Sequence, residues 1–382
     1  MNSYIEKVRS HNQSLPVQPI AMLKIYGCQQ NLADGNRLRG LLVAMGYRMT
    51  DDLAEADLLV INTCAVREHA EKRVLGHLGG FLHQGKPGRR VVLCGCMAAR
   101  PEIRKLIEKS YKQVDLTFPP SDIPKFPEYL HKLLQEGSRY FYDSPITSPI
   151  AEDLPIVRDL PDRAHVTIMT GCDNFCSYCI VPYVRGRERS RRPEDVLSEI
   201  KGLVEENCPE IWLLGQNVNS YAPNFPDLLR EAGQFEGSYS LRFMTSHPKD
   251  AGEDLFYAMA QTARAAPFLH LPLQAGSDKI LQAMNRGYTA KQYHEKITAA
   301  RKHIPHLNLT SDILVGFPGE TEQDFQETLD MVRKIRFNSL FTFIFSPRQG
   351  TPAAQLEQTT PASEIKDRFQ RLLDLQREIE GR

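Results

Sequence analysis

Residues 171–191 read GCDNFCSYCIVPYVRGRERSR and place three cysteines close together, Cys172, Cys176 and Cys179. Their spacing is Cys-x-x-x-Cys-x-x-Cys, and no neighbouring fourth cysteine or histidine completes a tetrahedral zinc site. Three thiolates can instead hold a 4Fe–4S cube and leave its fourth iron open to a small chelating ligand. The spacing therefore favours an iron–sulfur site; the alternatives are a zinc site or three buried cysteines.

A repeated strand–helix pattern surrounds this stretch. Short apolar runs alternate with helical patterns, of which 192–207 and 320–336 are the clearest. Six such strand–helix units predict a (β/α)6 part-barrel, whose chemistry lies at the carboxyl ends of its strands. The expected strands are 165–170, 210–215, 241–246, 268–273, 307–316 and 339–346.

The first part of the chain predicts a different α/β domain. Apolar runs rich in branched residues at 21–26, 57–62 and 91–95, with helical patterns at 31–46 and 66–83, indicate a doubly wound parallel sheet. Cys28, Cys64 and Cys96 each follow one of these strands, so they should meet at the carboxyl edge of the sheet, where open α/β folds bind ligands. Three convergent thiols suit a second cube, although unrelated core cysteines are the alternative. Cys94 and Cys208 are expected to be structural.

The chain has 382 residues, more than one core usually serves, and we expect two domains. The predicted boundaries are an N-terminal domain at 1–136, a linker rich in Pro and Asp at 137–164, and a second domain at 165–382. An amphipathic helix over 362–379, with Ile365, Phe369, Leu372 and Ile379 on one stripe, should close the second domain.

Composition narrows the class of protein. Lysine plus arginine equals aspartate plus glutamate, 47 each, so the chain is not a globally basic nucleic-acid binder, although a local basic patch is compatible with this balance. No long apolar run or apolar leader is present, which predicts a cytoplasmic protein without a membrane span. In that compartment the eight cysteines are expected as thiols or metal ligands rather than disulfides.

Several segments together resemble the radical S-adenosylmethionine (SAM) methylthiotransferases. In that superfamily a loop like GCDNFCSYC holds a 4Fe–4S cluster whose free iron binds SAM. The resemblance runs from about residue 22 to the end, and INTCAVRE, GQNVNSY and TSHP are most similar to the MiaB-type tRNA branch. The matching segments are YGCQQN (26–31), INTCAVREHAEKRV (61–74), GCMAAR (95–100), GCDNFCSYCIVPYVRGRERSR, LLGQNVNSY, RFMTSHP, HLPLQAGSDKILQAMNRGYT and DILVGFPGETEQDFQETL.

The resemblance implies two 4Fe–4S clusters, SAM, and a methylthio group added to carbon 2 of an isopentenylated adenosine beside the tRNA anticodon. An electron donor such as flavodoxin or ferredoxin would be required. Sister enzymes act on threonylcarbamoyl-adenosine or on a ribosomal-protein aspartate, and a zinc-stabilised RNA-binding module is the alternative of another class. Family members usually continue into a small RNA-binding β-barrel, and because this sequence ends in LQREIEGR we expect it to lack that barrel.

Other residues are expected near the cofactor. The resemblance suggests that amides after a barrel strand, Gln216 and Asn217, contact SAM or the substrate base. Arg242 and Gln274 should point from strand ends into the same cavity, and Gly316 and Gly319 of VGFPGE should allow close backbone approach to a ligand. The arginines that follow the cysteine loop could bind tRNA phosphates or the SAM carboxylate, or lie on a solvated surface. They are Arg185, Arg187, Arg189, Arg191 and Arg192.

Overall fold

The computed structural model describes residues 2–65, 68–81, 86–145, 150, 152 and 154–381. The chain forms two compact units. The first contains Met1–Pro161 together with Tyr183–Arg187, and the second contains Asp162–Pro182 together with Glu188–Arg382. The short segment Tyr183–Arg187 therefore packs with the first unit although the sequence on both sides of it belongs to the second.

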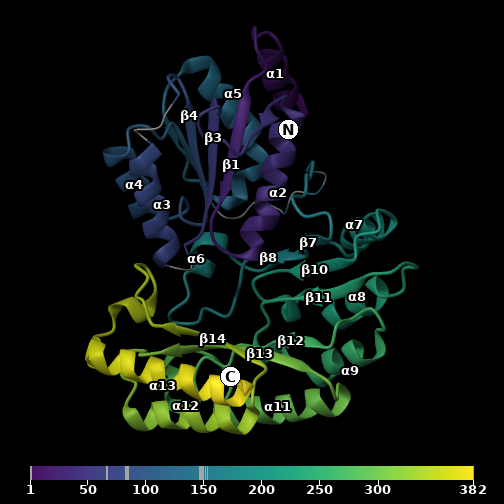
Figure 1. Cartoon of the computed structure of the whole chain (residues 1–382), viewed down its shortest axis with the longest axis vertical. Coiled ribbons are helices and arrows are strands. Elements are labelled where there is room, and N and C mark those ends of the chain that lie inside the picture. Colours follow the sequence, from purple (N-terminus) through teal and green to yellow (C-terminus); the bar gives the residue numbers. More distant parts are fainter. Residues whose placement is uncertain are drawn as a thin grey trace. The chain divides into compact units, whose positions relative to one another are not determined.

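The first unit is built on a six-stranded sheet in which every neighbouring pair is parallel (Figure 1). The strand order is β2-β1-β3-β4-β5-β6. This architecture confirms the predicted doubly wound sheet. The strands are β1 (Ile20–Ile25), β2 (Arg48–Met49), β3 (Leu58–Thr63), β4 (Arg90–Gly95), β5 (Leu116–Phe118) and β6 (Tyr140–Phe141).

Helices cover both faces of this sheet. On one face α1 (Asn2–Gln13), α2 (Gln29–Ala44) and α5 (Phe126–Glu136) pack against Leu58 and Val60. On the other face α3 (Glu68–Phe81) and α4 (Pro101–Ser110) pack against Leu59 and Ile61. Successive strand residues point to opposite faces, so a strand buried on both sides must be apolar throughout. This requirement explains the unbroken apolar runs in the sequence.

The predicted linker at 137–164 is largely part of the first unit. Tyr140 and Phe141 form the edge strand β6, Leu154 packs on the core, and the backbone N–H of Val157 donates to the carbonyl of Asn36 at 3.1 Å. Asp159 forms an ion pair with Arg39 at 2.7 Å. Pro and Asp content indicated irregular backbone correctly but could not reveal that this backbone packs. Residues 146–149, 151 and 153 of the predicted linker lie outside the described residues.

The second unit contains six parallel strands, which confirms the predicted part-barrel. They form two three-stranded sheets, β7-β10-β11 and β12-β13-β14, and a single bridge between Leu241 and Ala265 extends the first sheet toward the second. The strands are β7 (Arg163–Thr167), β10 (Glu210–Leu214), β11 (Ser240–Phe243), β12 (Phe268–His270), β13 (Asn308–Val315) and β14 (Ser339–Ile344). The predicted strand at 165–170 is interrupted at Ile168, after which β8 (Met169–Thr170) pairs antiparallel with β9 (Arg189–Ser190).

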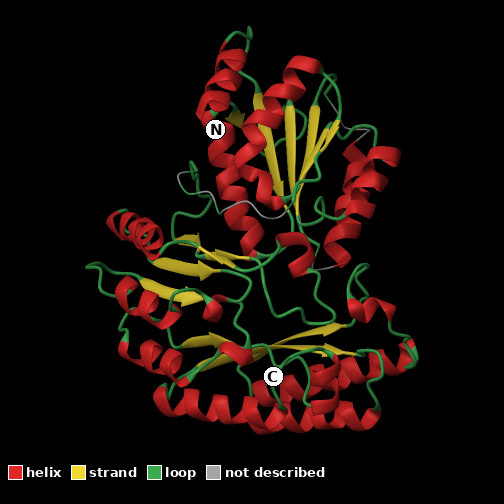
Figure 2. Ribbon diagram, turned by 180° about the vertical axis from the view of Figure 1, so that it is seen from behind, coloured by secondary structure: helices red, strands yellow, loops and turns green. Residues whose placement is uncertain are grey.

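The helices of the second unit line one side of these strands (Figure 2). The last one, α13, packs against β14 and α12 and buries Ile365 and Leu372 as predicted, while Phe369 and Ile379 are half-buried. None of the helices within the described ranges is long and apolar enough to cross a membrane. The helices are α6 (Val181–Arg185, placed with the first unit from Tyr183), α7 (Pro193–Glu205), α8 (Phe225–Ala232), α9 (Glu253–Gln261), α10 (Asp278–Ala283), α11 (Ala290–His303), α12 (Glu322–Ile335) and α13 (Ala362–Glu380).

Candidate functional site

The cysteines of the first unit lie at the carboxyl edge of its sheet. Cys28 follows β1, Cys64 follows β3 and Cys96 follows β4, and these three strands are neighbours in the sheet. The chain passes from β1 to β2 on one side and then to β3 on the other, so β1 and β3 flank a topological switch point. Open α/β sheets bind their ligands at such points. The sheet therefore places these thiols where a ligand site is expected.

Cys28 and Cys64 are in contact. Cys28 is the N-cap residue of α2, and a hydrogen bond with Cys64 lowers the pKa of Cys28 to about 6 against the opposing effect of burial. Gly27 permits this approach, because it has φ +121° and a Cβ there would lie 2.2 Å from the Cβ of Cys64. A side chain at residue 27 would therefore displace one of the predicted ligands.

Cys96 is buried and faces a cation. Burial raises the pKa of this thiol, and Nε of Arg185 donates to its Sγ at 3.2 Å. Arg185 belongs to Tyr183–Arg187, the segment that packs with the first unit. Its guanidinium also donates to Oδ1 of Asn31 at 3.1 Å and pairs with Asp34 at 2.7 Å. The thiol thus lies in a polar, buried and partly cationic environment.

In the second unit the loop that carries Cys172, Cys176 and Cys179 is held by the last residue of α10 and the residues that follow it. Ser177 donates its N–H to the carbonyl of Met284 at 3.0 Å and its hydroxyl to the carbonyl of Ala283 at 2.8 Å. The amide of Asn285 donates to the carbonyl of Phe175 at 3.1 Å. Phe175 itself has φ 46°, a conformation that a bulky residue adopts only when its surroundings enforce it. The loop therefore has a defined conformation.

Two side chains approach the middle cysteine of this loop. Nη1 of Arg286 donates to Sγ of Cys176 at 3.3 Å, and Nε2 of His247 lies 3.9 Å from the same sulfur. Nδ1 of His247 accepts from the backbone N–H of Lys249 at 3.1 Å, so the neutral ring carries its proton on Nε2, facing the sulfur. Burial lowers the pKa of His247 to about 2, which keeps the ring neutral.

The donor set suits iron–sulfur clusters better than single ions. Burial raises the pKa of Cys172 to about 11 and that of Cys179 to about 12, and binding of metal to such thiols must release their protons. Among the described residues no group of three His, Cys, Asp or Glu side chains could hold one metal ion. In a cube each thiolate binds a different iron, so the three sulfurs need not surround a single ion. Each set of three thiols could supply the three protein ligands of such a cluster.

The predicted SAM contacts lie at the carboxyl ends of strands with one exception. Gln216 follows β10 and its Oε1 accepts from the N–H of Gly171 at 2.6 Å, next to the cysteine loop. Asn217 is buried and donates to Asp250 at 2.7 Å, while its Oδ1 has no hydrogen-bond partner among the described residues. Gln274 has φ 71°, and its N–H and carbonyl pair with Asp312 and Leu314 of β13.

Arg242 is the exception. It lies within β11, and its Nε pairs at 2.9 Å with Glu210, the first residue of β10. Its guanidinium also lies over the rings of Trp212 and Phe268, with centroid distances of 5.6 and 5.7 Å. The expectation that Arg242 points from a strand end into the cavity is wrong, because the position of an arginine in a short apolar run does not reveal where its long side chain reaches.

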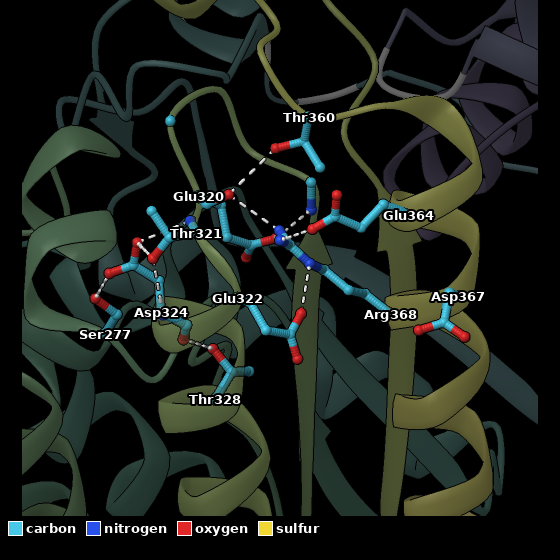
Figure 3. Close-up of polar contacts among 12 residues, drawn as sticks. Ser277, Glu320, Thr321, Glu322, Asp324, Thr328, Thr360, Glu364, Asp367 and Arg368 are labelled. Carbon is cyan, nitrogen blue, oxygen red and sulfur yellow. Dashed lines mark hydrogen bonds and ion pairs between the residues drawn. The ribbon is translucent and has the colours of Figure 1, made fainter.

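Gly316 and Gly319 lie in the turn between β13 and α12, which Figure 3 shows with its polar contacts. Both have positive φ, +73° and +83°. Oε2 of the buried Glu320 accepts from the N–H of Gly316 at 2.8 Å and from Arg368 of α13 at 3.3 Å. A Cβ on Gly316 would meet Ile365, whereas one on Gly319 would meet no atom. The close approach at Gly316 is therefore to α13, while Gly319 lies in open space.

Comparisons with known proteins agree with this geometry. The chain matches the Radical SAM superfamily model over residues 166–332 and the model named Uncharacterized protein family UPF0004 over residues 21–119. The tRNA-2-methylthio-N(6)-dimethylallyladenosine synthase of Acetivibrio thermocellus is 45% identical, with 98% of this chain and 81% of that protein covered. The enzyme of the same name from Clostridioides difficile is 43% identical, with 98% and 80% covered.

The chain belongs to this family of tRNA methylthiotransferases. The methylthiotransferase also shares its fold with solved radical SAM enzymes. The methyltransferase TsrM of Kitasatospora setae, solved with tryptophan and a SAM analog, superposes with a TM-score of 0.66 at 15% identity, covering 88% of this chain and 75% of that one. The cobalamin-dependent enzyme OxsB superposes with a TM-score of 0.61 at 12% identity, covering 94% and 56%. At these identities the likeness concerns the fold alone.

Four polar residues of the methylthiotransferase's thiol sites were not predicted as site residues. Asp34 and Asn31 lie on α2, and His247 and Arg286 contact Cys176. His247 lies in RFMTSHP and Arg286 in HLPLQAGSDKILQAMNRGYT, two motifs that carry the family resemblance. Their place in these motifs was the signal that could have identified them as site residues. No sequence motif marked Asp34 as a site residue. It is a charged residue of α2 whose side chain is buried in the structure.

Proposed function

We propose that this methylthiotransferase adds a methylthio group to carbon 2 of an isopentenylated adenosine beside the anticodon of tRNA. The observation that carries the proposal is 45% identity over nearly the whole chain to a synthase named for that product. The two sets of three thiols are consistent with it. The target carbon bears an unactivated aromatic hydrogen, which a general base cannot remove, so the reaction requires radical chemistry.

Cys28, Cys64 and Cys96 would hold one 4Fe–4S cluster, and Cys172, Cys176 and Cys179 would hold the other together with SAM. When bound, these groups supply one-electron chemistry and sulfur transfer that side chains cannot provide. The task of the protein is to hold and orient them. Arg286 and His247 donate to the sulfur of Cys176, and such contacts to a ligand orient it and adjust its electron density.

The residues around the second thiol set would position SAM. Gln216 fixes the backbone of Gly171 at the start of the cysteine loop. The unpartnered buried Oδ1 of Asn217 is an acceptor suited to an ammonium group such as the amino group of SAM. Gln274 and the open side of Gly319 are the remaining candidates for contact with SAM or the base. Gly316 contributes to the shape of the turn through its packing against α13.

The substrate and partners follow from this activity. tRNA is the substrate of the named relatives, and a one-electron donor such as flavodoxin or ferredoxin would supply reducing equivalents. The reaction would take place in the cytoplasm, where tRNA and reduced carriers are found.

An anaerobic assay tests the proposal. Protein reconstituted with iron and sulfide is incubated with SAM, reductant and one of three substrates: isopentenylated tRNA, threonylcarbamoylated tRNA or the ribosomal protein bearing the target aspartate. Mass spectrometry should find the methylthio product only with isopentenylated tRNA. A product from either other substrate would assign a sister activity, and purified protein with zinc but no iron or sulfide would refute the cluster assignment.

A further inference from the structure

The arginines between residues 185 and 192 differ in how far their side chains are buried. Arg185 and Arg191 are buried, with side chains 5% and 6% exposed, whereas the side chain of Arg192 is 76% exposed. Arg191 donates to the carbonyl of Thr167 and pairs with Glu199 within the second unit. Arg185, in contrast, contacts a predicted cluster ligand, Cys96. The basic run thus includes a buried arginine that lies against a predicted cluster ligand.

The guanidinium of Arg185 donates hydrogen bonds to the side chains of Cys96, Asn31 and Asp34. Nε donates to Sγ of Cys96 at 3.2 Å, and Nη2 donates to Oδ1 of Asn31 at 3.1 Å and to Oδ2 of Asp34 at 2.7 Å. A planar guanidinium can satisfy these directions at once, whereas the ammonium of a lysine is a point charge on a flexible stem. The site therefore requires the shape of arginine as well as its charge.

The same contacts reach a second thiol. Sγ of Cys28 lies 3.7 Å from Oδ1 of Asn31, the oxygen that also accepts from Arg185. Asn31 is held in turn, because its Nδ2 donates to the carbonyl of Tyr26 at 2.8 Å and its carbonyl accepts from Asn62 at 2.9 Å. Cys28 and Cys96, which emerge from different strands, thus share one buried polar network centred on Arg185.

Charge balance shows why this cation is tolerated. A buried cation is costly unless it is paired, and Asp34, with a side chain 6% exposed, provides the pairing charge. Asp34 also accepts from Gln30 at 3.2 Å and lies 3.9 Å from Arg37, so it has other partners. Pairing with Asp34 alone does not account for the direction of Nε, which points at the sulfur of Cys96.

We propose that Arg185 is a positioning residue for the first thiol set, fixing Cys96 and, through Asn31, Cys28 for cluster binding. The inference rests on the proposed assignment of Cys28, Cys64 and Cys96 as cluster ligands. Hydrogen bonds to ligand sulfurs hold the ligands in place and raise the reduction potential of a cluster by stabilising its more negative state. Arg185 would therefore increase both the retention of this cluster and its potential.

The test isolates the first cluster. The parent protein is the whole chain with Cys172, Cys176 and Cys179 all changed to alanine. We compare this parent with three variants made in it: Arg185→Met, Arg185→Met/Asp34→Asn and the control Arg192→Met. Loss of iron to a chelator, the electron paramagnetic resonance spectrum and the midpoint potential are measured for each. Arg185→Met should lose iron about 10- to 100-fold more readily and have a more negative potential. Arg192→Met should behave as the parent.

The double variant separates positioning from folding. It removes both members of the buried pair, so the melting temperature of the cofactor-free protein should return toward that of the parent while the cluster stays weakly held. The role assigned to Arg185 is wrong if, in the double variant, iron retention and the midpoint potential of the cluster recover together with the melting temperature. It is also wrong if Arg185→Met matches the parent in these measurements. If the parent background binds no iron or sulfide, the ligand assignment fails and this inference fails with it.

Discussion

The Cβ that Gly316 lacks would lie 2.6 Å from Cγ2 of Ile365, forty-nine residues further along the chain. Gly316 begins the turn after β13, and Ile365 lies in the first half of α13. The turn and the helix are also joined by Arg368, which donates to both the carboxylate and the carbonyl of Glu320. The shape of this turn therefore depends on a helix far away in the sequence.

The first prediction compares the two glycines of this turn. Gly316→Ala should destabilise the protein by about 2–5 kcal/mol, because positive φ and collision with Ile365 both oppose a side chain. Gly319→Ala should cost only about 1 kcal/mol, since it has positive φ but open space. Denaturant unfolding measures both. Ile365→Ala should partly relieve Gly316→Ala, and strictly additive effects of these two changes would contradict the packing explanation.

Glu320 should make stability depend on pH. Burial raises the pKa of this carboxyl from 4.5 to about 7, although the Gly316 N–H and Arg368 oppose the rise. The folded state then binds a proton that the unfolded state releases, so the free energy of unfolding should fall as pH rises from about 4.5 to 7. The total loss is about 3 kcal/mol. Glu320→Gln should remove this slope, as measured by urea unfolding of the cofactor-free protein between pH 5 and 8.

Glu322 provides the matched control for that experiment. A hydrogen bond from Arg371 lowers the pKa of this half-exposed carboxyl, so its stabilising contribution is present above its unfolded pKa and is lost as pH falls. Glu322→Gln should leave the slope between pH 5 and 7 intact. An unchanged slope in Glu320→Gln would show that Glu320 is ionised throughout this range.

The two thiol sets should differ in the step that they support. Cys28→Ala should spare reductive cleavage of SAM but abolish methylthio transfer, whereas Cys176→Ala should abolish both. The reason is that SAM would bind at the second set and the transferred sulfur at the first. Chromatography of SAM products and mass spectrometry of tRNA nucleosides measure the two steps separately. Methylthio transfer by Cys28→Ala would refute the role given to the first unit.

The exposed arginines should contribute to tRNA binding through charge. Arg187→Gln should weaken binding of tRNA regardless of its modification and reduce the magnitude of the slope of log affinity against log salt by about one, the signature of one lost phosphate contact. Filter binding at several salt concentrations gives this slope. Arg191→Gln is the control: it should lower stability, because it removes contacts to Thr167 and Glu199, and leave the slope unchanged.

Much of the fold follows from the sequence because its signals are local. Buried parallel strands must be apolar on both faces, so runs such as 57–62 and 91–95 are visible without further information. The positions of Cys28, Cys64 and Cys96 follow from the same rule, since each comes directly after such a strand. The spacing of the cysteines around Cys176 is enough to predict an iron–sulfur site. The other motifs then indicate the family.

The remaining features depend on contacts between distant residues. Arg185 and Arg192 belong to one basic run, yet one is buried against Asp34 and the other is largely exposed, which no local pattern distinguishes. Arg242 lies on a predicted strand but reaches back to Glu210. The stretch at 137–164 has the composition of a linker, and its packing on the first unit depends on partners such as Asn36.

The turn of residues 316–320 also bears on how the second unit can be divided. The Radical SAM superfamily match ends at residue 332, yet the buried ion pair of Glu320 is completed by Arg368 and the space beside Gly316 is filled by Ile365. A fragment that ended at residue 332 would lack α13, so it would expose the buried Glu320 and leave a cavity beside Gly316 where Ile365 packs. The smallest piece of this unit expected to fold independently therefore extends through α13 to Glu380.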